Sequence, residues 1–189
     1  MTPAELRPKH CHVCRSLFGP RSSFATCCSP PCAIKKATAD RLAQAKQERA
    51  DTRKRKAALQ TIPELIKLTQ RDFNGYIRFR DKAGGFPCIS SGRVLDWSSN
   101  SVDAGHYRSV GAASHLRFDE RNVHAQSKHD NQYKAGNVVD YRINLIQRIG
   151  IEAVEALEAD NKPHKWTREE LLGIRAEYKA KLKEMKDAE

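Results

Sequence analysis

The stretch Val102-Asp-Ala-Gly-His-Tyr-Arg-Ser109, followed by Leu116-Arg-Phe-Asp-Glu-Arg-Asn-Val-His124, decides the fold of this chain. Both segments are short and β-prone, and glycine and serine residues punctuate the sequence around them, so the sequence predicts two short strands. Helical sequence begins near Asn131, shortly after the second segment. Two strands and a helix would bring the polar side chains of both strands close to Asn131.

Helical patterns surround these strands. Thr61-Ile-Pro-Glu64 and Thr167-Arg-Glu-Glu170 are capping boxes, in which the threonine hydroxyl accepts from an early backbone N–H and the glutamate reaches back to the cap. Apolar residues recur at helical spacing after both boxes, and again before Gly150. The sequence therefore predicts a mainly helical α+β protein, with helices from 61 to about 83, at 138–149, at 151–160 and from 168 to about 187. The last of these has a narrow apolar seam, which either dimerises or packs on the core.

Five of the six cysteines fall within the first 32 residues. Thiols clustered in this way in a reducing compartment indicate metal before disulfides. Cys11-x2-Cys14 and Cys28-x3-Cys32 supply two close thiolate pairs, a set that suits a closed, structural, tetrahedral Zn2+ site. Alternation along a short strand would point Cys27 away from the ion, but Cys27 in place of Cys28 stays open, as do His10 and His12 as substitutes. Free thiols or a redox pair are the alternative to metal.

From Ala33 to Ala58 the chain consists of good helix formers without glycine or proline. Nine basic residues face three acids in this segment, so the helix cannot neutralise its own charge. It needs an anionic partner or plain solvent around it. The nine basic residues are candidate contacts to nucleic-acid phosphates: Lys35, Lys36, Arg41, Lys46, Arg49, Arg53, Lys54, Arg55 and Lys56.

The whole chain is polar and basic. Its 189 residues carry 34 lysines and arginines against 23 acids, a formal net charge of +11. This length excludes a large multi-domain enzyme. No apolar run approaches the roughly 18 residues that a membrane span needs, and the first eight residues lack the apolar core of a secretory signal. We therefore expect a cytoplasmic protein without a membrane partner.

The polar residues of the central region resemble a nuclease motif. Asp103-Ala-Gly-His106, then Asn122-Val-His124, then Asn131 follow the order of residues in the His-Asn-His (HNH) nucleases. The ββα-metal motif of those enzymes uses a first His as general base, a middle Asn to orient it, and a last His or Asn near the helix start to hold a divalent cation.

The resemblance extends along most of the chain. The runs 103–107, 116–126, 131–137 and 145–150, with the cysteine cluster and the basic helix in the expected order, resemble the NinG (Rap) recombination proteins of lambda-like phages. That family implies a structure-specific endonuclease that nicks branched DNA, such as D-loops and Holliday junctions, with Mg2+ or Mn2+. It further implies a homodimer in the infected host cell, with phage or host recombination proteins as partners.

On this resemblance the chain has four segments. They are a zinc-binding module at 1–34, the basic helix at 35–60, an HNH-like ββα-metal nuclease core with its preceding helix at 61–150, and C-terminal helices at 151–189. His106 would be the general base, because an imidazole with a pKa near ~6.5 accepts a proton at neutral pH. Asn122 would orient it, and Asn131 would bind the catalytic cation.

The chain departs from the family pattern directly before the base. A carboxylate or a histidine often stands there, whereas this sequence has Gly105. Asp103, His124 and His129 therefore compete as the second protein ligand of the catalytic cation.

A second departure concerns structural metal. Relatives often carry two further cysteine pairs, which here fall at Cys88 with Ser91 and at Ser127 with Asp130. An altered site of Cys88, Asp130 and a nearby His such as His129 is one alternative. A metal-free core held by packing is the favoured one.

Further nucleic-acid contacts are expected near the motif. Trp97, Tyr107 and Phe118 either stack on unpaired bases or pack in the core, and core packing is the favoured use of each. Seven arginines are candidates to bind the strand that is cleaved, and the sequence does not choose among them: Arg78, Arg80, Arg108, Arg117, Arg121, Arg142 and Arg148.

The competing function is a non-catalytic, zinc-stabilised nucleic-acid adaptor whose nuclease core has decayed.

Overall fold

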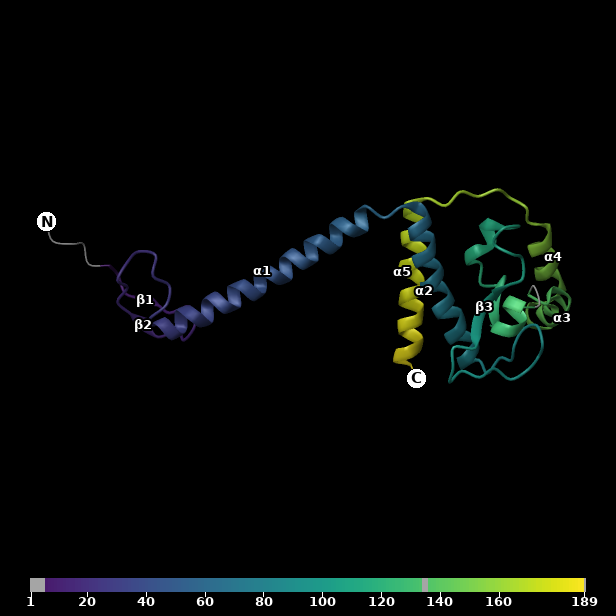
Figure 1. The fold of residues 1–189 in the computed structure, drawn as a ribbon, viewed down its shortest axis with the longest axis horizontal. Helices are drawn as coiled ribbons and strands as arrows, with labels where there is room; N and C mark the ends of the chain where they lie inside the picture. Colours follow the sequence, from purple (N-terminus) through teal and green to yellow (C-terminus); the bar gives the residue numbers. More distant parts are fainter. Residues whose placement is uncertain (1–5, 134–135, 189) are drawn as a thin grey trace. The chain divides into compact units, whose positions relative to one another are not determined.

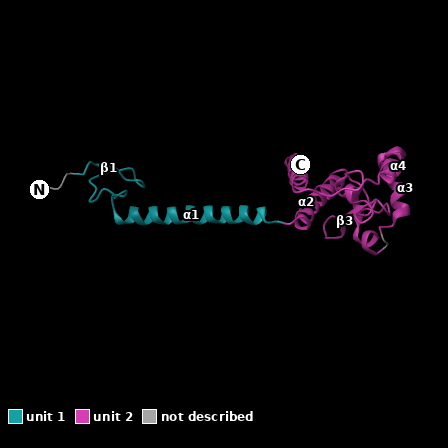
Figure 2. Ribbon diagram, turned by 90° about the horizontal axis from the view of Figure 1, so that it is seen from above, with its two compact units in different colours: residues 1–60 teal, residues 61–189 magenta. Residues whose placement is uncertain are grey.

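The computed structural model describes residues 6–133 and 136–188. The chain divides into two compact units, Met1–Gln60 and Thr61–Glu189, which are coloured separately in Figure 2. The described residues are mainly helical and carry two small antiparallel sheets, so the predicted α+β class is confirmed. None of the helices in these ranges combines the length and the apolar composition that crossing a membrane requires. The four segments expected from the sequence stay predictions.

The first unit consists of a short hairpin and one long helix. Strands β1 (Lys9–His10) and β2 (Leu17–Phe18) pair antiparallel, and α1 follows at Pro30–Ala58. Figure 1 shows α1 as a single uninterrupted helix. The helix begins at Pro30, three residues before the expected Ala33. Proline is tolerated in the first turn, because its missing N–H would have no intrahelical partner there and its φ is already helical. No residue of α1 is buried.

The second unit begins with the helix α2 (Ile62–Ala83) and ends with the helix α5 (Arg168–Asp187). Both predicted capping boxes are present, and in α2 the Thr61 backbone N–H donates to the Glu64 carboxylate over 2.7 Å. Between these helices lie β3 (Val102–His106), the 3-10 helix η1 (Ser114–Phe118), β4 (Val123–Ser127), the π-helical turn η2 (His129–Tyr133), α3 (Val138–Ile149) and α4 (Ile151–Ala159).

The predicted strand at 116–124 is wrong over most of its length. Its first residues form η1, and a turn at Asp119–Asn122 follows. The Asp119 carboxylate accepts a hydrogen bond from the Arg121 backbone N–H over 2.8 Å, which favours a turn over extended chain. The strand β4 therefore starts only at Val123 and continues to Ser127.

Strands β3 and β4 pair antiparallel, with Asp103 opposite Gln126 and Gly105 opposite His124. Side chains alternate along a strand, so the register sorts the polar residues onto two faces. His106 lies on the face of Val102 and Ala104, whereas Asp103 lies on the other face.

The helix α5 packs on α2, and Figure 1 shows the two side by side. The rings of Phe73 and Tyr178 meet edge to face with centroids 4.7 Å apart, and Leu171 is fully buried beside them. Ala104 and Phe118 join the same core, so one face of the β3–β4 pair rests on these helices. Of the two uses predicted for the last helix, the structure shows packing on the core.

A buried carboxylate connects α2 to β4 and α3. Asp81 is completely buried in α2, and its Oδ2 atom accepts from the Ala125 backbone N–H over 2.6 Å. The Arg80 guanidinium lies 2.8 Å from the other carboxylate oxygen, and Arg148 of α3 lies 3.4 Å from Oδ2. A buried ion pair of this kind is expensive to break, because the remaining partner keeps an uncompensated charge.

We expect Asp81→Ala to lower the free energy of unfolding by about 3–5 kcal/mol, because it leaves two guanidiniums and a backbone N–H without their acceptor. Urea denaturation of the full chain measures this. The control is Glu177→Ala, which removes the exposed Glu177–Lys181 pair of α5 and should cost only about 0.5 kcal/mol or less. Equal losses in both variants would contradict the role of Asp81.

Candidate functional site

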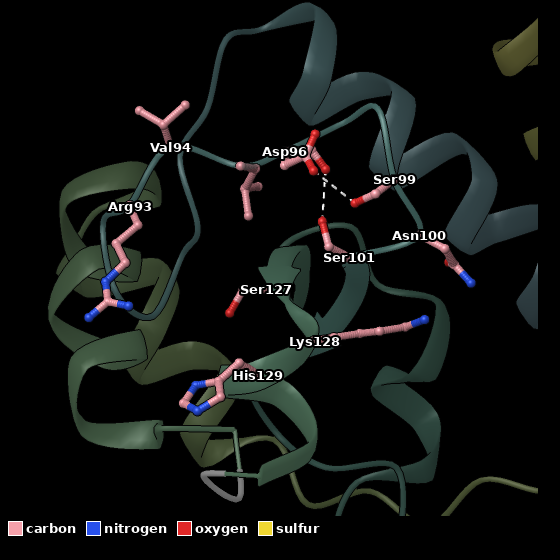
Figure 3. A pocket seen from close by; sticks show the side chains of 10 residues that line it. Arg93, Val94, Asp96, Ser99, Asn100, Ser101, Ser127, Lys128 and His129 are labelled. Atoms are coloured by element: carbon pink, nitrogen blue, oxygen red, sulfur yellow. Dashed lines mark hydrogen bonds between the residues drawn. The ribbon is translucent and has the colours of Figure 1, made fainter.

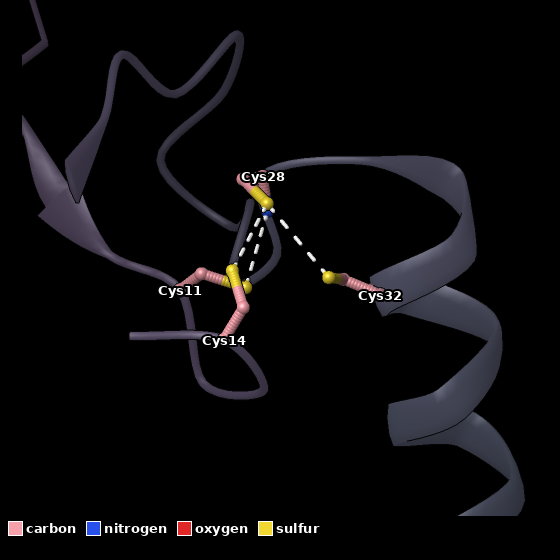
Figure 4. Close-up of side chains that lie close together, drawn as sticks. All are labelled: Cys11, Cys14, Cys28 and Cys32. Carbon is pink, nitrogen blue, oxygen red and sulfur yellow. Dashed lines mark hydrogen bonds between the residues drawn. The ribbon is translucent and has the colours of Figure 1, made fainter. Parts of the chain in front are cut away.

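Four cysteines gather at the start of α1. The Sγ atoms of Cys11, Cys14, Cys28 and Cys32 all lie within 4.8 Å of one another. Figure 4 shows the four side chains pointing toward a common centre. The Cys14 and Cys28 sulfurs are 3.5 Å apart, and those of Cys28 and Cys32 are 3.8 Å apart. A tetrahedral Zn2+ with bonds of about 2.3 Å holds its sulfurs about 3.8 Å apart, so these positions fit the ion.

Local backbone geometry produces this cluster. Arg15 adopts a left-handed φ of 61°, and its N–H donates to the Cys11 carbonyl, so the chain turns back between the first two thiols. Cys32 lies in the first turn of α1, which brings the second pair to the same point. The cluster contains Cys28 and not Cys27. The strand expected to sort these two cysteines is absent from the described residues around them, where the chain forms bends.

The chemistry of the four thiols also fits a cation. Backbone N–H groups, that of Cys14 first, lower the pKa of Cys11 to about 5. Hydrogen bonding to the Cys14 thiol raises the pKa of Cys28 to about 12. Thiolates this close repel one another, so they ionise together only when a positive charge lies between them. Zn2+ would supply that charge and tie the hairpin to α1.

The His106 ring is held by a backbone carbonyl. Its Nε2 atom lies 3.1 Å from the Arg117 carbonyl oxygen, which can only accept, so Nε2 carries the proton and Nδ1 keeps its lone pair. Burial lowers the pKa of His106 below its usual value, so the ring is neutral at pH 7. A neutral imidazole with a free Nδ1 can accept a proton.

Asn122 fixes the carbonyl that holds His106. Its buried side chain donates to the Leu116 carbonyl over 3.1 Å and accepts from the Arg108 backbone N–H over 2.8 Å. Leu116 directly precedes Arg117 in η1, so Asn122 acts on the imidazole through the backbone and not by touching it. The Arg117 carbonyl contacts the His106 ring, whereas Asn122 has no described contact with that ring.

Asp103 and Asn131 meet on the opposite face of the strand pair. The Asp103 Oδ2 atom accepts from the Asn131 amide over 3.0 Å and from the Gln132 amide over 2.9 Å. The sequence reasoning missed Gln132, although its position directly after Asn131 was a signal. The structure brings Asp103 and Asn131 together, and no described contact joins either of them to His106.

His124 is engaged at both ring nitrogens. Its Nε2 atom lies 3.1 Å from the Arg121 carbonyl, and its Nδ1 atom lies 3.1 Å from Arg80 and 3.3 Å from Arg148. Burial first, and then the charge of Arg80, lower the pKa of His124 to about 4. Two guanidiniums beside the ring repel a cation, which favours a structural role for His124. His129 is exposed and lies near the ring of Tyr133.

Hydrogen bonds join the residues at the positions where the resemblance suggests further cysteines. The Asp130 Oδ2 atom accepts from the Cys88 thiol over 3.3 Å and from the Ser127 hydroxyl over 2.8 Å. The Ser127 backbone N–H in turn lies 3.3 Å from the Cys88 sulfur. Among the residues that the structure describes, the buried Ser91 hydroxyl has no hydrogen-bond partner. Within residues 6–133 and 136–188, the four cysteines near α1 are the one group of metal-ligand side chains that meets at a point.

A pocket of about 640 Å³ opens beside Ser127 and His129 (Figure 3). Lys128 and His129 border it from the chain after β4, and Arg93 and Asp96 border it from the loop before β3. In Figure 3 the side chains of Lys128 and Asn100 extend toward the same side of the pocket. The pocket rim thus carries more basic than acidic groups.

The structure explains why glycine precedes His106. A Cβ atom on Gly105 would overlap the Oε1 atom of Gln126, which is fully buried and lies against the glycine. The amide of Gln126 donates to the Ser90 hydroxyl and to the Gly136 carbonyl, so it cannot turn away freely. A carboxylate or histidine at position 105 therefore has no room.

The seven candidate arginines differ in whether they make hydrogen bonds or ion pairs within the protein. Six of them make internal hydrogen bonds or ion pairs, for example Arg142 with Glu158 over 2.7 Å and Arg108 with the Leu157 carbonyl over 2.8 Å. Arg78 makes neither with any residue that the structure describes. Among the aromatic candidates, Tyr107 and Phe118 are buried in the core, as favoured, and Trp97 is half-buried.

We expect Gly105→Ala to destabilise the second unit by about 1–3 kcal/mol in urea denaturation, because the new methyl group overlaps buried Gln126. Gly111→Ala is the matched control, since nothing lies within 4 Å of its Cβ position, and it should change stability by about 0.5 kcal/mol or less. Truncation of Gln126 to alanine should reduce the effect of Gly105→Ala. A neutral Gly105→Ala would refute the packing explanation.

We expect the purified chain to hold one zinc ion, measured by elemental mass spectrometry, and Cys28→Ser to lose it because the set of four thiolates is broken. Cys27→Ser is the neighbouring control and should keep the ion, since the Cys27 sulfur lies outside the cluster. Retention of zinc in Cys28→Ser together with its loss in Cys27→Ser would contradict the assignment.

Comparison with known proteins places the chain in a family. A family model described as the bacteriophage lambda NinG protein matches residues 3–189. The protein ninG of Salmonella phage P22 is 44% identical over 190 residues, which covers 93% of this chain and 91% of that protein. The protein ninG of Escherichia phage lambda is 41% identical over 201 residues, covering 98% and 96%.

The protein ninG of Escherichia phage 933W is 47% identical over 134 residues, covering 71% of this chain and 64% of that protein. No solved structure matches the chain. The family model spans the cysteine cluster, the basic helix α1 and the central strands alike. The chain therefore belongs to the NinG family of bacteriophage proteins.

Proposed function

We propose that this protein is a structure-specific endonuclease with an HNH-like core, which nicks branched DNA in phage recombination with the help of a divalent cation. The observation that carries the proposal is the support of His106. Asn122 holds the backbone at Leu116 and Arg117, and the Arg117 carbonyl accepts a hydrogen bond from the Nε2–H group of His106. The Nδ1 atom of the neutral ring is then left as a proton acceptor. This is the arrangement that a general base needs.

The proposed reaction is hydrolysis of a phosphodiester. Nδ1 of His106 accepts a proton from a water molecule, the water oxygen bonds to phosphorus, and the bond from phosphorus to one sugar oxygen breaks. A bound divalent cation supplies positive charge to the phosphate and the leaving oxygen. Asp103 and Asn131 would hold that cation, since a carboxylate and an amide oxygen suit Mg2+ or Mn2+, which keep several waters besides such ligands.

The charge of α1 supports DNA as the partner. Lys36 pairs with Asp40, but Glu48 accepts a hydrogen bond from Gln44 and Asp51 accepts one from Gln47. Among the described residues, the other eight basic side chains of the helix have no acidic partner. Contacts from them to about six phosphates would give a log-log salt slope near about −5 and carry no sequence information.

Recognition would then depend on the shape of the DNA. A homodimer would present two sites to two strands of a junction, and other recombination proteins of the phage or the host would act on the same DNA.

One observation favours the second candidate function, a nucleic-acid adaptor without catalysis. His106 lies on one face of the β3–β4 pair, while Asp103 and Asn131 meet on the other. A base and a cation must act on the same phosphate, so a permanent separation would leave binding without cleavage.

The deciding experiment compares wild type with His106→Ala on labelled D-loop, four-way junction and linear duplex DNA, with Mg2+ or Mn2+. We expect wild type to nick the branched substrates, and His106→Ala to lose about 10²–10⁴-fold in rate while it still binds, because only the base is removed. His164→Ala is the control histidine and should cleave normally.

The pH dependence gives an independent readout. Because burial lowers the pKa of His106, its active neutral form persists below pH 6.5, and cleavage should fall only at more acidic pH, where the ring becomes protonated. Binding of branched DNA without cleavage under either ion would reject the nuclease and support the adaptor.

A further inference from the structure

A second cleft lies between the last part of α2, the last part of α5 and the loop before β3. We call it the cation-aromatic cleft and define it by Arg78, Phe79, Lys82, Trp97 and Lys186. Its volume is about 350 Å³, within the range of about 300–1,000 Å³ typical of small-ligand sites. None of the residues assigned to the zinc cluster or to the proposed catalytic set lines it.

Positive charge converges on this cleft without compensation. Arg78, Lys82 and Lys186 form no ion pair with any acid in the described part of the chain. Other cations on the same two helices are paired, for example Arg175 with Asp72 over 2.6 Å and Lys181 with Glu120 over 2.9 Å. Among the described cations of α2 and α5 that form no ion pair, Arg78, Lys82 and Lys186 line the cavity, whereas Lys67 and Lys183 lie on the exposed surface away from it.

Helix-end electrostatics account for only part of this charge. Lys82 and Lys186 lie in the last turns of α2 and α5, where cations are favoured by the helix dipole. Arg78 lies more than one turn from the end of α2, so this explanation does not cover it. An anion in the cleft would face all three cations.

The aromatic groups of the cleft offer a surface for stacking. Trp97 packs on one side against the cluster of Leu95 and Val102, and it is half-buried. Its indole N–H donates to no residue that the structure describes. Phe79 lies nearby on α2, with the Lys186 ammonium 5.8 Å from its ring centroid. A flat ring entering the cleft would therefore meet aromatic surface beside positive charge.

The cleft continues toward the pocket of Figure 3. Ser99 and Asn100 line both cavities, so the loop before β3 forms the common border between the cleft and the pocket. Lys128 extends to the same side of that pocket as Asn100. A nucleic-acid backbone that leaves the cleft across this loop would meet the further positive charge of Lys128.

We propose that the cation-aromatic cleft binds an unpaired nucleotide of single-stranded DNA, with its base stacked on Trp97 and its phosphates held by Arg78, Lys82 and Lys186. Aromatic stacking beside a basic groove is how single strands are held without sequence preference. Duplex DNA keeps its bases stacked inside, so the cleft discriminates a displaced strand from a duplex. This inference rests on the proposed function, since it identifies the single-stranded part of a branched DNA as what the protein grips.

The test uses the full chain and a fluorescent oligo(dT) of about 12 nucleotides, without added Mg2+ or Mn2+. The cleft variant is Arg78→Gln/Lys82→Gln/Lys186→Gln. The matched control is Lys67→Gln/Lys162→Gln/Lys165→Gln, which removes the same charge from exposed positions that do not line the cleft. We expect the cleft variant to bind oligo(dT) about 10-fold or more weakly and to lower the log-log salt slope by about 2, while the control keeps the wild-type slope.

A second variant tests the stack. Oligo(dT) should quench the tryptophan fluorescence of wild type, and Trp97→Leu, which keeps an apolar side chain against Leu95, should lose the quenching and bind about 10-fold more weakly. Equal effects of the cleft and control variants, unchanged quenching in Trp97→Leu, or tighter binding of oligo(U) than of oligo(dT) would each overturn the inference. A failure of the proposed endonuclease activity would be distinguishable from this. In that case the protein would nick no branched DNA, but its binding of oligo(dT) would still depend on the cleft.

Discussion

The buried carboxylate of Asp81 is the interaction on which the second unit depends. One of its oxygens accepts from the Ala125 N–H in the middle of β4, and Arg80 and Arg148 surround the charge. Arg80 in turn donates to the Val123 carbonyl over 3.1 Å. Because a buried charge must stay paired, this network permits only one position of β4 against α2. The position of β3, and therefore of His106, follows from β4 by strand pairing.

The same network decides which positive charges are available for DNA. Arginines close to the central motif, such as Arg80 and Arg148, are committed to the interior and hold His124 neutral between them. A guanidinium that compensates a buried carboxylate cannot also grip a phosphate without breaking the core. Cations without an acidic partner among the described residues lie instead along α1, in the cation-aromatic cleft and at exposed positions such as Lys67 and Lys183. Core stability and the proposed nucleic-acid binding would therefore use separate sets of basic residues.

Side chains near the central motif fill the two places where the family resemblance suggests metal ligands. The Gln126 amide fills the space that a carboxylate at position 105 would need, and it is anchored by the Ser90 hydroxyl and the Gly136 carbonyl. Cys88 and Asp130 likewise hold each other through a hydrogen bond where a structural metal could stand. In both places a polar side chain makes hydrogen bonds to its neighbours and fills the volume.

Local signals in the sequence determined the elements with short-range causes. The capping boxes at Thr61 and Thr167 set two helix starts, and the spacing of Cys11, Cys14, Cys28 and Cys32 predicted a cluster that the structure brings together. The strand expected at 116–124 is a 3-10 helix and a turn over most of its length, and in that turn the Asp119 carboxylate accepts a hydrogen bond from the Arg121 N–H. Alternation along β3 already places His106 and Asp103, three residues apart, on opposite faces. Only the tertiary structure decided which of these faces rests on α2, and it decided the pairing of Asp81 with Arg148, 67 residues away. Such contacts depend on where distant segments pack, and no local periodicity encodes that.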